Sequence, residues 1–286
     1  MNTISDNHDL VITNLHFVYP PPRRVEAIKR LDLKIKAGEF VAVIGHNGSG
    51  KTTLSKLISG YLEPSEGTIT IGGVVVHKIP AHQRPMVVGY VFQNPDHQVF
   101  RDTVWEDVAF GLENIKIPED EIQRVVRDTL EDLDLWHLRE LHPFRIGKGD
   151  RQRVAVAGLL VMNPKILVVD EPTTGQDPER AREIMRLMTR LNEERGITII
   201  TITHAMDLVV EFVKRVIVMG QGEILLDEGV REAFSKPDIL AKTYVQPPAV
   251  ARVGLALGLN PLPLTVDEAV EQILRRCVPV KDTLAR

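Results

Sequence analysis

The order of apolar and polar positions predicts β-strands near the start of the chain and again after residue 165. Apolar and polar residues alternate from Leu10 to Val18 and from Leu31 to Ile35, a pattern typical of strands with one exposed face. Phe40 to Ile44 and Ile166 to Val169 are instead short, continuous apolar runs. Such runs are typical of parallel strands that are buried on both faces.

A long helical pattern lies between two of the later strands. It extends from Pro178 to Arg195 and stops at Gly196, a residue type that commonly ends helices. A further apolar run, Ile197 to Ile202, comes directly after it. This alternation of strand, helix and strand predicts the α/β fold class with a doubly wound sheet.

The pattern changes to helices in the middle of the chain. The expected helices are Thr103 to Asn114, Pro118 to Leu135 and Asp150 to Met162. We interpret residues 95–163, approximately, as a helical subdomain inserted into the α/β core.

Prolines mark a change of composition near residue 236. They surround two short amphipathic patterns near Ala249 to Leu257 and Val266 to Arg275. The predicted organisation is one large domain, residues 1–236, and a small helical extension, residues 237–286, which is a candidate for dimerisation.

Composition excludes some classes of function. With 35 basic and 39 acidic residues the net charge is -4, so we expect no nucleic acid partner. Cys277 is the only cysteine, which rules out an internal disulfide and fits a reducing compartment. No apolar run approaches the roughly 18 residues of a membrane span, and Met1 to Leu10 lacks the apolar region of a signal peptide. If the protein works at a membrane, another chain is expected to hold it there.

A glycine-rich motif comes after the strand Phe40 to Ile44. A turn of this kind between a strand and a helix N-terminus aims backbone N–H groups and the helix dipole at a bound phosphate. Lys51 would reach the β- and γ-phosphates of a nucleotide, and the Thr52 hydroxyl would bind Mg²⁺. The motif comprises Gly45, His46, Asn47, Gly48, Ser49, Gly50, Lys51, Thr52 and Thr53.

Two adjacent carboxylates come after the buried strand Ile166 to Val169. Asp170 and Glu171 would lie at the carboxyl end of this strand, where open α/β sheets bind ligands. Asp170 is predicted to hold Mg²⁺ through its water shell, and Glu171 to polarise the attacking water. In isolation such a pair is more often solvated than catalytic, and it is the phosphate loop that favours the catalytic interpretation.

Three further residues lie at the ends of predicted strands. His204, after Ile197 to Ile202, would be in reach of a γ-phosphate, although a lone histidine is more often structural. Gln93 comes after the strand-like run Val87 to Phe92 and would sense Mg²⁺ or the γ-phosphate, a role that a glutamine alone does not establish. Tyr19 ends the first strand, where its ring would either stack on adenine or pack against its neighbours.

The order of these motifs resembles the nucleotide-binding subunit of an ATP-binding cassette (ABC) transporter, over residues 8 to about 235. Within that superfamily, the chain resembles the ATPase subunits of energy-coupling factor (ECF) importers of vitamins and of nickel or cobalt ions. The segments that carry this closer resemblance are Val91 to Gln98, Glu106 to Glu113 and Asp170 to Asp177.

The resemblance assigns roles residue by residue. Glu171 becomes the catalytic base of an ATPase, His204 the residue that responds to the γ-phosphate, and Tyr19 the ring that stacks on adenine. Asp177 would belong to the loop that crosses the dimer. The implied Mg²⁺ ligands are Thr52, Gln93 and Asp170.

The resemblance also implies partners and a location. Such subunits act as head-to-tail pairs, in which each ATP lies between one chain's phosphate loop and the other chain's signature motif. The expected partners are a second ABC ATPase subunit, identical or different, a transmembrane coupling protein and a substrate-binding membrane protein. The chain would then be a peripheral protein on the cytoplasmic face of the cell membrane, where ATP hydrolysis drives import.

The signature motif departs from the family pattern. In place of Leu-Ser-Gly-Gly-Gln this chain has Ile146, Gly147, Lys148, Gly149 and Asp150. The serine that meets the partner's γ-phosphate is absent, so the contacts implied here come from Gly147, Lys148 and Gly149, and Lys148 is expected to substitute electrostatically. Asp150 is predicted to be the N-cap of a helix that begins at the next residue.

A groove beside Gln93 is the predicted docking site for a helix of the membrane partner. The alternative is that the same side chains pack the core of the helical subdomain. The candidates are Phe92, Val99, Phe100, Val104 and Trp105.

Two other functions fit the motifs less well. A soluble ABC ATPase of repair would carry a long insertion, but from residue 51 to residue 170 there are only 119 positions. ATPases of translation usually join two cassettes in one chain. A weakly hydrolysing regulatory subunit would fit the altered signature, yet such subunits commonly lose the carboxylate at the position of Glu171.

Overall fold

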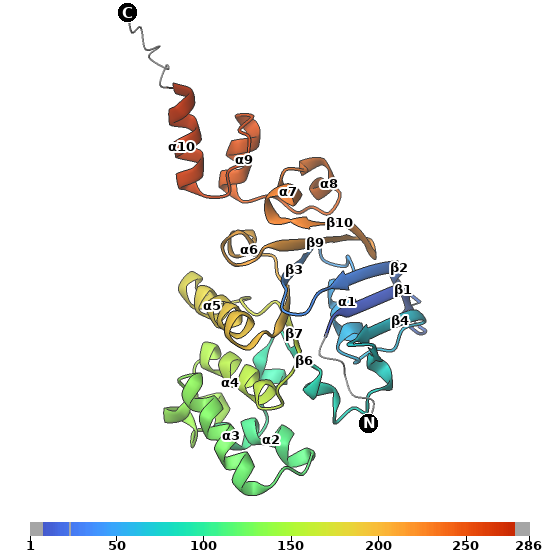
Figure 1. Ribbon diagram of the computed structural model, residues 1–286, viewed down its shortest axis with the longest axis vertical. Helices are drawn as coiled ribbons and strands as arrows, with labels where there is room; N and C mark the ends of the chain where they lie inside the picture. The colour runs from blue at the N-terminus through green and yellow to red at the C-terminus, as the bar shows by residue number, and fades with distance from the viewer. Residues whose placement is uncertain (1–7, 23, 278–286) are drawn as a thin grey trace, which may run out of the picture.

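Two β-sheets with a helix between them form the centre of the protein, and further helices cover the outer face of the larger sheet (Figure 1). The computed structural model describes residues 8–22 and 24–277. The larger sheet has the strand order β10-β9-β3-β8-β7-β6, with β10 antiparallel and the other strands parallel. Its strands are β3 Phe40–Ile44, β6 Val88–Val91, β7 Ile166–Asp170, β8 Thr198–Ile202, β9 Arg215–Gly220 and β10 Glu223–Gly229.

The smaller sheet is antiparallel and has the order β2-β1-β4-β5. Leu31, Leu33 and Ile35 are buried while the residues between them are exposed, so the half-exposed strand expected here is confirmed. The bounds expected for the first strand are confirmed as well. The strands are β1 Leu10–Val18, β2 Glu26–Ile35, β4 Glu66–Ile71 and β5 Val74–Val75.

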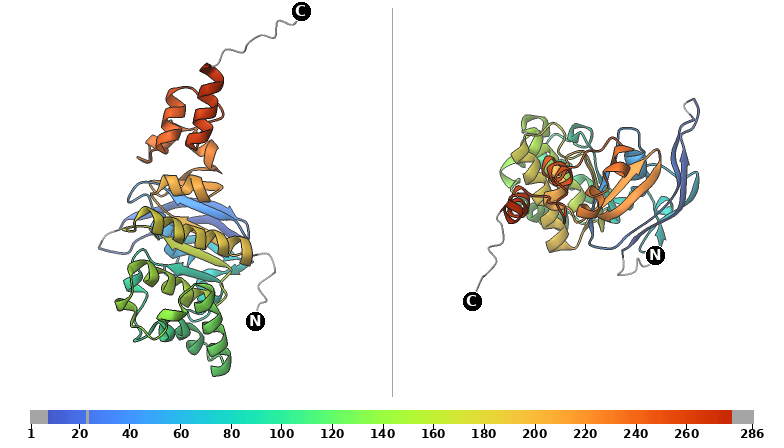
Figure 2. Two further views of the ribbon diagram at one scale, coloured as in Figure 1. Left: turned by 90° about the vertical axis from the view of Figure 1, so that its left-hand side faces the viewer. Right: turned by 90° about the horizontal axis from the view of Figure 1, so that it is seen from above.

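Helix α1 (Lys51–Ile58) lies between the two sheets (Figure 2). Its side chains Leu54, Leu57 and Ile58 are buried in one apolar core with residues of both sheets. Because α1 comes after β3 and a short loop, its N-terminus lies at the carboxyl end of the parallel strands. This is the edge where open α/β sheets bind ligands.

The long helix predicted from Pro178 to Arg195 is confirmed as α5 (Pro178–Arg195). The side chain of Asp177 caps its first turn, and Gly196 ends it in the left-handed conformation at φ 66°. Residues of α5 pack on β7 from the face opposite α1. The shorter α6 (Met206–Phe212) comes after β8.

The region between β6 and β7 is helical, as expected, and lies at one end of the protein (Figure 1). Thr103 and Glu106 form a reciprocal capping box that fixes the start of the first helix. The second helix ends three residues before the expected Leu135, because Asp134 adopts a left-handed conformation at φ 54°. The helices are α2 Val104–Asn114, α3 Glu119–Asp132 and α4 Lys148–Leu160.

The predicted N-cap role of Asp150 is wrong. Helix α4 begins at Lys148, and Gly147 is its N-cap, with an extended backbone and a carbonyl that accepts from the Arg151 N–H. Asp150 therefore lies in the first turn, where its negative charge complements the helix dipole and pairs with Arg153.

Within the described part of the chain, four helices come after β10 and extend from the end of the protein opposite α3 (Figure 1). The two amphipathic helices expected after residue 248 are confirmed. Arg231, in the first helix after β10, joins the last helix to the rest of the protein, because its guanidinium binds the Glu268 carboxylate through two hydrogen bonds. Within the described residues, no helix combines the length and apolar character needed to cross a bilayer. The helices are α7 Val230–Phe234, α8 Pro237–Ala241, α9 Ala249–Ala256 and α10 Val266–Cys277.

Several connections contain short 3₁₀ helices. They are η1 Val76–Lys78, η2 Arg84–Met86, η3 Pro95–His97, η4 Trp136–Leu138 and η5 Pro143–Arg145.

Candidate nucleotide-binding site

The loop between β3 and α1 requires glycine at two positions, because a side chain there would clash with neighbouring backbone. A Cβ atom on Gly45 would lie 2.2 Å from the Met219 carbonyl oxygen, and one on Gly50 would lie 2.7 Å from the Ala27 carbonyl oxygen. Gly50 is the N-cap of α1, and no side chain caps the N–H groups of the first turn. These donors are therefore available to an anion, as in other phosphate sites at helix N-termini.

The buried side chain of Lys51 folds back onto the phosphate loop. Its Nζ donates to the carbonyl oxygens of Gly45 at 2.8 Å and His46 at 2.9 Å. An ammonium group has three N–H donors, so one remains for a phosphate oxygen. Burial lowers the pKa of Lys51, while the carboxylates of Glu171 and Asp170 oppose that effect and favour the charged form.

Asp170 ends β7 and is 5% exposed. Burial raises the pKa of Asp170, and hydrogen bonds from Tyr90 and Thr52 oppose that rise. The predicted ligands Thr52 and Asp170 are thus close enough for Thr52 to affect the pKa of the carboxyl. Mg²⁺ binds to proteins through few carboxylates, with waters and substrate phosphates completing its shell, so this donor pair fits the ion. No cluster of three or more acidic, His or Cys side chains suited to a metal occurs among residues 8–22 and 24–277.

Three side chains converge on Glu171. The Gln93 amide donates to Oε2 at 2.8 Å, the Thr174 hydroxyl donates to Oε2 at 3.0 Å, and His204 Nε2 lies 3.1 Å from Oε1. Glu171 has a left-handed backbone at φ 46°, and its own N–H donates to the Ile202 carbonyl oxygen at 2.9 Å. The structure thus joins three residues that the sequence places on three different strand ends. A carboxylate held in this way can accept a proton from a water beside the phosphates.

Tyr19 lines the same cavity as the phosphate loop, which has a volume of about 490 Å³. Its hydroxyl lies 3.1 Å from the Thr53 hydroxyl, and its ring meets Phe17 edge to face, with 4.9 Å between centroids. The ring therefore belongs to the site and also packs against a neighbour. Adenine stacking on Tyr19 remains a prediction.

The signature segment lies away from this cavity, whose lining includes none of residues 146–150. Lys148 Nζ donates to the Thr174 carbonyl oxygen at 3.0 Å. A Cβ on Gly149 would lie 3.0 Å from the Arg180 guanidinium, so Gly149 admits a close approach between the signature segment and α5. The signature segment thus contacts the loop after Glu171 through Thr174 and the first turn of α5 through Arg180.

Three residues of the site were not predicted. Tyr90 donates from its hydroxyl to Asp170 Oδ2 at 2.7 Å, and Thr174 binds Glu171. Tyr244, beyond α8, places its ring against His46 of the phosphate loop at a centroid distance of 5.9 Å. For Tyr90 the sequence held one signal, its position on the strand before Gln93. Tyr244 gave no such signal, because it is 198 positions from His46, the residue that it contacts.

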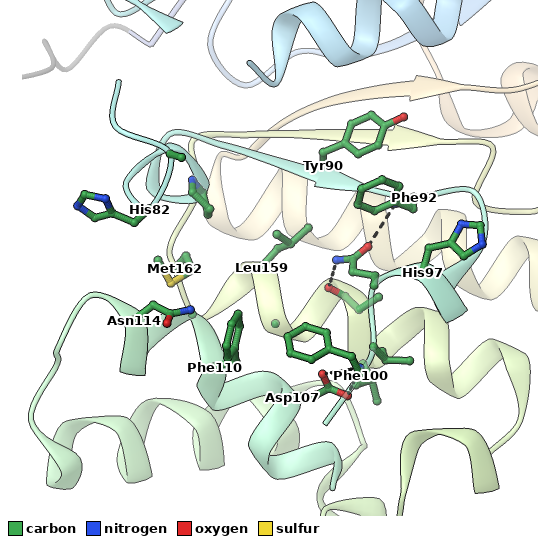
Figure 3. A pocket seen from close by; sticks show the side chains of 18 of the residues that line it. His82, Tyr90, Phe92, His97, Phe100, Asp107, Phe110, Asn114, Leu159 and Met162 are labelled. Atoms are coloured by element: carbon green, nitrogen blue, oxygen red, sulfur yellow. Dashed lines mark hydrogen bonds between the residues drawn. The ribbon is translucent and has the colours of Figure 1, made fainter. Parts of the chain in front are cut away.

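A second cavity, of about 720 Å³, lies between the end of β6 and helices α2 and α4 (Figure 3). Phe92, Val99 and Phe100, three of the predicted docking residues, line it. The other two predictions are wrong. Val104 is fully buried in the helical core, and Trp105 does not line the cavity but packs against a second tryptophan.

The chain is similar to proteins of one family along most of its length. The family described as ABC transporter matches residues 28–174. A putative ABC transporter ATP-binding protein of Methanosarcina acetivorans is 42% identical over 256 residues, which are 88% of this chain and 42% of that protein. The chain therefore spans less than half the length of this relative. The energy-coupling factor transporter ATP-binding protein EcfA1 of Clostridioides difficile is 40% identical over 269 residues, which are 92% of this chain and 97% of that protein.

Solved structures with the same fold agree with these similarities. CbiO1 of Clostridium perfringens, described as part of the ABC transporter complex CbiONQ, is 35% identical with a TM-score of 0.74, over 88% of this chain and 100% of that one. The ATP-binding cassette MJ0796, in a dimeric post-hydrolysis state bound to ADP and Pi, is 28% identical with a TM-score of 0.69, over 78% of this chain and 99% of that one.

Proposed function

This chain belongs to the ABC transporter family, and we propose that it is the ATP-hydrolysing subunit that energises an ECF-type membrane importer of a vitamin or a transition-metal ion. The observation that carries the proposal is the convergence of Gln93, Thr174 and His204 on Glu171, beside a phosphate loop. The similarity to an ECF ATP-binding protein over 97% of that protein's length supports the importer type.

The residues divide the work of phosphoryl transfer between them. The phosphate loop and Lys51 hold the β- and γ-phosphates, and Glu171 takes the proton of the attacking water. His204 and Gln93 keep the carboxylate turned toward that water. Thr52 and Asp170 would hold Mg²⁺, which would supply positive charge beside the phosphates when bound.

A second ATPase subunit completes each site. In a single chain the signature segment is outside the phosphate-loop cavity, so a partner's Gly147, Lys148 and Gly149, or their equivalents, would close over the nucleotide. We propose that residues 1–236 form the ATPase domain and that the extension after residue 236 contributes to the pairing. Exposed apolar side chains support this role for the extension: Val253, Leu257, Val266, Val270 and Leu274.

The cavity between β6, α2 and α4 is proposed to receive a helix of the transmembrane coupling protein. Its wall is largely aromatic, with Phe92, Phe100 and Phe110, and the Phe100 side chain is 60% exposed. Apolar grooves of this kind accept the apolar face of an amphipathic helix. Docking would hold the chain at the cytoplasmic face of the membrane as a peripheral subunit, together with a substrate-binding membrane protein.

Co-purification and transport test this proposal. The chain is produced with the membrane proteins of its own source, isolated in detergent, and every chain in the complex is identified. We expect a second ATPase subunit and two membrane proteins, and ATP-dependent uptake once the complex is in vesicles. ATP hydrolysis by a chain that binds no membrane protein would instead indicate a soluble ABC ATPase. Assembly without ATP hydrolysis would indicate a regulatory subunit.

A further inference from the structure

Tyr90, in β6, contacts two sites. One is the cavity between β6, α2 and α4, called the docking cavity below, and the other is the Asp170 carboxylate proposed to bind Mg²⁺. Its ring lies in the wall of the cavity beside Phe92, with 4.9 Å between the centroids, and its hydroxyl points away from the cavity (Figure 3). That hydroxyl donates to Asp170 Oδ2 at 2.7 Å. One side chain, only 4% exposed, therefore spans the distance between the two sites.

The Tyr90 hydroxyl donates to the Asp170 carboxylate at 2.7 Å, and a phenol keeps its proton up to a pH of about 10. A neutral phenol beside a carboxylate donates to it, and such a charge-assisted bond is short and directional. The hydrogen bond from Tyr90 to Oδ2 therefore constrains which lone pairs of the Asp170 carboxylate can face a metal ion.

Tyr90 is held by strand pairing on one side and by other rings on the other. β6 pairs in parallel with β7, with Tyr90 opposite Val168, and β6 is an edge strand of its sheet. Tyr90 also contacts Tyr61, with 5.5 Å between the ring centroids, and Tyr61 lines the cavity as well. A side chain that enters the cavity therefore meets a cluster of three packed rings, of which one carries the hydroxyl bound to Asp170.

We propose that Tyr90 is a positioning residue that orients Asp170 for Mg²⁺ and reports occupation of the docking cavity to the metal site. Gln93 holds Glu171 from the same segment, so residues 90–93 control two adjacent carboxylates through two different donors. The reporting role rests on the proposed docking of a membrane partner, whereas the orienting role does not.

The orienting role is tested on the isolated chain with magnesium chloride and a non-hydrolysable ATP analogue. Tyr90→Phe removes only the hydroxyl, and Tyr61→Phe is the matched control because it removes a hydroxyl from the same ring cluster. Calorimetry measures analogue binding as a function of Mg²⁺ concentration. For Tyr90→Phe we expect the Mg²⁺ midpoint to rise about tenfold, as is usual when a partner of a metal ligand is lost, with unchanged binding in the absence of Mg²⁺. Equal midpoints in wild type and Tyr90→Phe would overturn the inference.

The reporting role is tested by comparing the isolated chain with the assembled membrane complex. In wild type, the Mg²⁺ midpoint for analogue binding is expected to differ between the two by about threefold or more, because docking and metal binding are coupled. In Tyr90→Phe the two midpoints should coincide. A shift that survives in Tyr90→Phe, or no shift in wild type, overturns the reporting role. Failure to assemble any complex would contradict the proposed docking but leave the calorimetric result on the isolated chain intact.

Discussion

Gln93 donates a hydrogen bond from its side-chain amide to Glu171 Oε2 at 2.8 Å, although 78 positions separate the two residues in sequence. Gln93 comes after β6 and directly follows Phe92, which lines the cavity between β6, α2 and α4, and Glu171 comes directly after β7. The carboxylate proposed as the general base is therefore held partly by a residue next to the proposed docking site of a membrane partner. Movement of that residue would release one of the three contacts that fix the carboxylate.

Glu171→Gln should abolish turnover while leaving nucleotide binding intact. The amide keeps the shape of the side chain but cannot accept the proton of the attacking water. Loss of a general base costs about 10²–10⁴ in rate, so we expect at least a hundredfold fall in kcat. Turnover by the assembled complex and ATP binding by calorimetry are the two measurements. Glu179→Gln, on the exposed first turn of α5, is the matched control, and wild-type turnover by Glu171→Gln would show that another group is the base.

Lys51→Ala should remove most ATP affinity without unfolding the protein. A hydrogen bond to a charged group contributes about 1.5–3 kcal/mol, or roughly ten- to a hundredfold in affinity. The rest of the cradle consists largely of backbone groups, which the substitution leaves in place. Calorimetry with ATP gives the affinity and thermal unfolding checks the fold. Lys36→Ala, at an exposed position, should bind ATP like wild type, and unchanged binding by Lys51→Ala would contradict the assignment of Lys51.

Much of this site could be predicted from sequence because parallel strands end at one edge of a sheet. The strands before Asp170, His204 and Gln93 were each visible as apolar runs, and the residues at the ends of adjacent strands lie close together. The contact of Gln93 and His204 with Glu171 is the direct result. The motifs thus identified the residues at the strand ends, and the order of the strands in the sheet brings those residues together.

Contacts between side chains on separate layers could not be predicted in this way. Tyr90 and Asp170 meet because Tyr90 belongs to the apolar core that contains α1, and a fully buried strand shows no periodicity that assigns its faces. The start of α4 was misplaced for a local reason. Gly147 caps the helix with its backbone alone, so the acidic residue three positions later appeared to be the better N-cap.

Phe100→Asp should prevent assembly with the membrane partner while leaving the chain folded. The ring is 60% exposed at the docking cavity, so the substitution places a charge where an apolar helix would pack and disturbs the core little. Leu141→Asp is the matched control, because Leu141 is 41% exposed but does not line the cavity. Co-purification of the complex and thermal unfolding of the isolated chain are compared. Normal assembly of Phe100→Asp would favour the view that these side chains only pack their own subdomain.

The attachment of α10 should weaken in acid. Arg231 lowers the pKa of Glu268 to about 2 from a usual value of 4.5, mainly through the bidentate hydrogen bond. A carboxyl with a lowered pKa stabilises the folded state fully above its unfolded pKa, and this stabilisation is lost as pH falls from about 4.5 to about 2. Hydrogen exchange of α10 amides in wild type and Glu268→Gln measures the effect. The extra protection in wild type should be present at pH 6 and shrink toward pH 3, and a difference that does not change with pH would contradict the pairing.

Lys148 is held at the first position of α4, where its ammonium donates to the Thr174 carbonyl oxygen at 3.0 Å. Thr174 also binds Glu171, so Lys148 is connected to the catalytic carboxylate of its own chain. To meet a partner's phosphate in the closed pair, the side chain has to leave this carbonyl. A unit charge pair at about 4 Å near a protein surface contributes roughly 4 kcal/mol before desolvation and entropy are subtracted. This gross attraction is of the same order as the roughly 1.5–3 kcal/mol of the serine hydrogen bond that this signature lacks, so the charge has the size that compensation requires.

Lys148→Ala should therefore lower turnover of the assembled complex at least about tenfold, because it removes the charge that replaces the missing hydroxyl. Gly147→Ser should raise turnover modestly. A Cβ at Gly147 meets nothing closer than 3.7 Å, and a serine there would restore the hydroxyl. It would also cap α4, but replacing glycine with serine at an N-cap changes stability by only about a few tenths of a kcal/mol. Thermal unfolding of each variant shows whether a change in turnover comes with a change in stability, as an effect of helix capping would. If Lys148→Ala hydrolyses ATP at the wild-type rate, the charge does not compensate, and the signature of the partner subunit carries the hydrolysis.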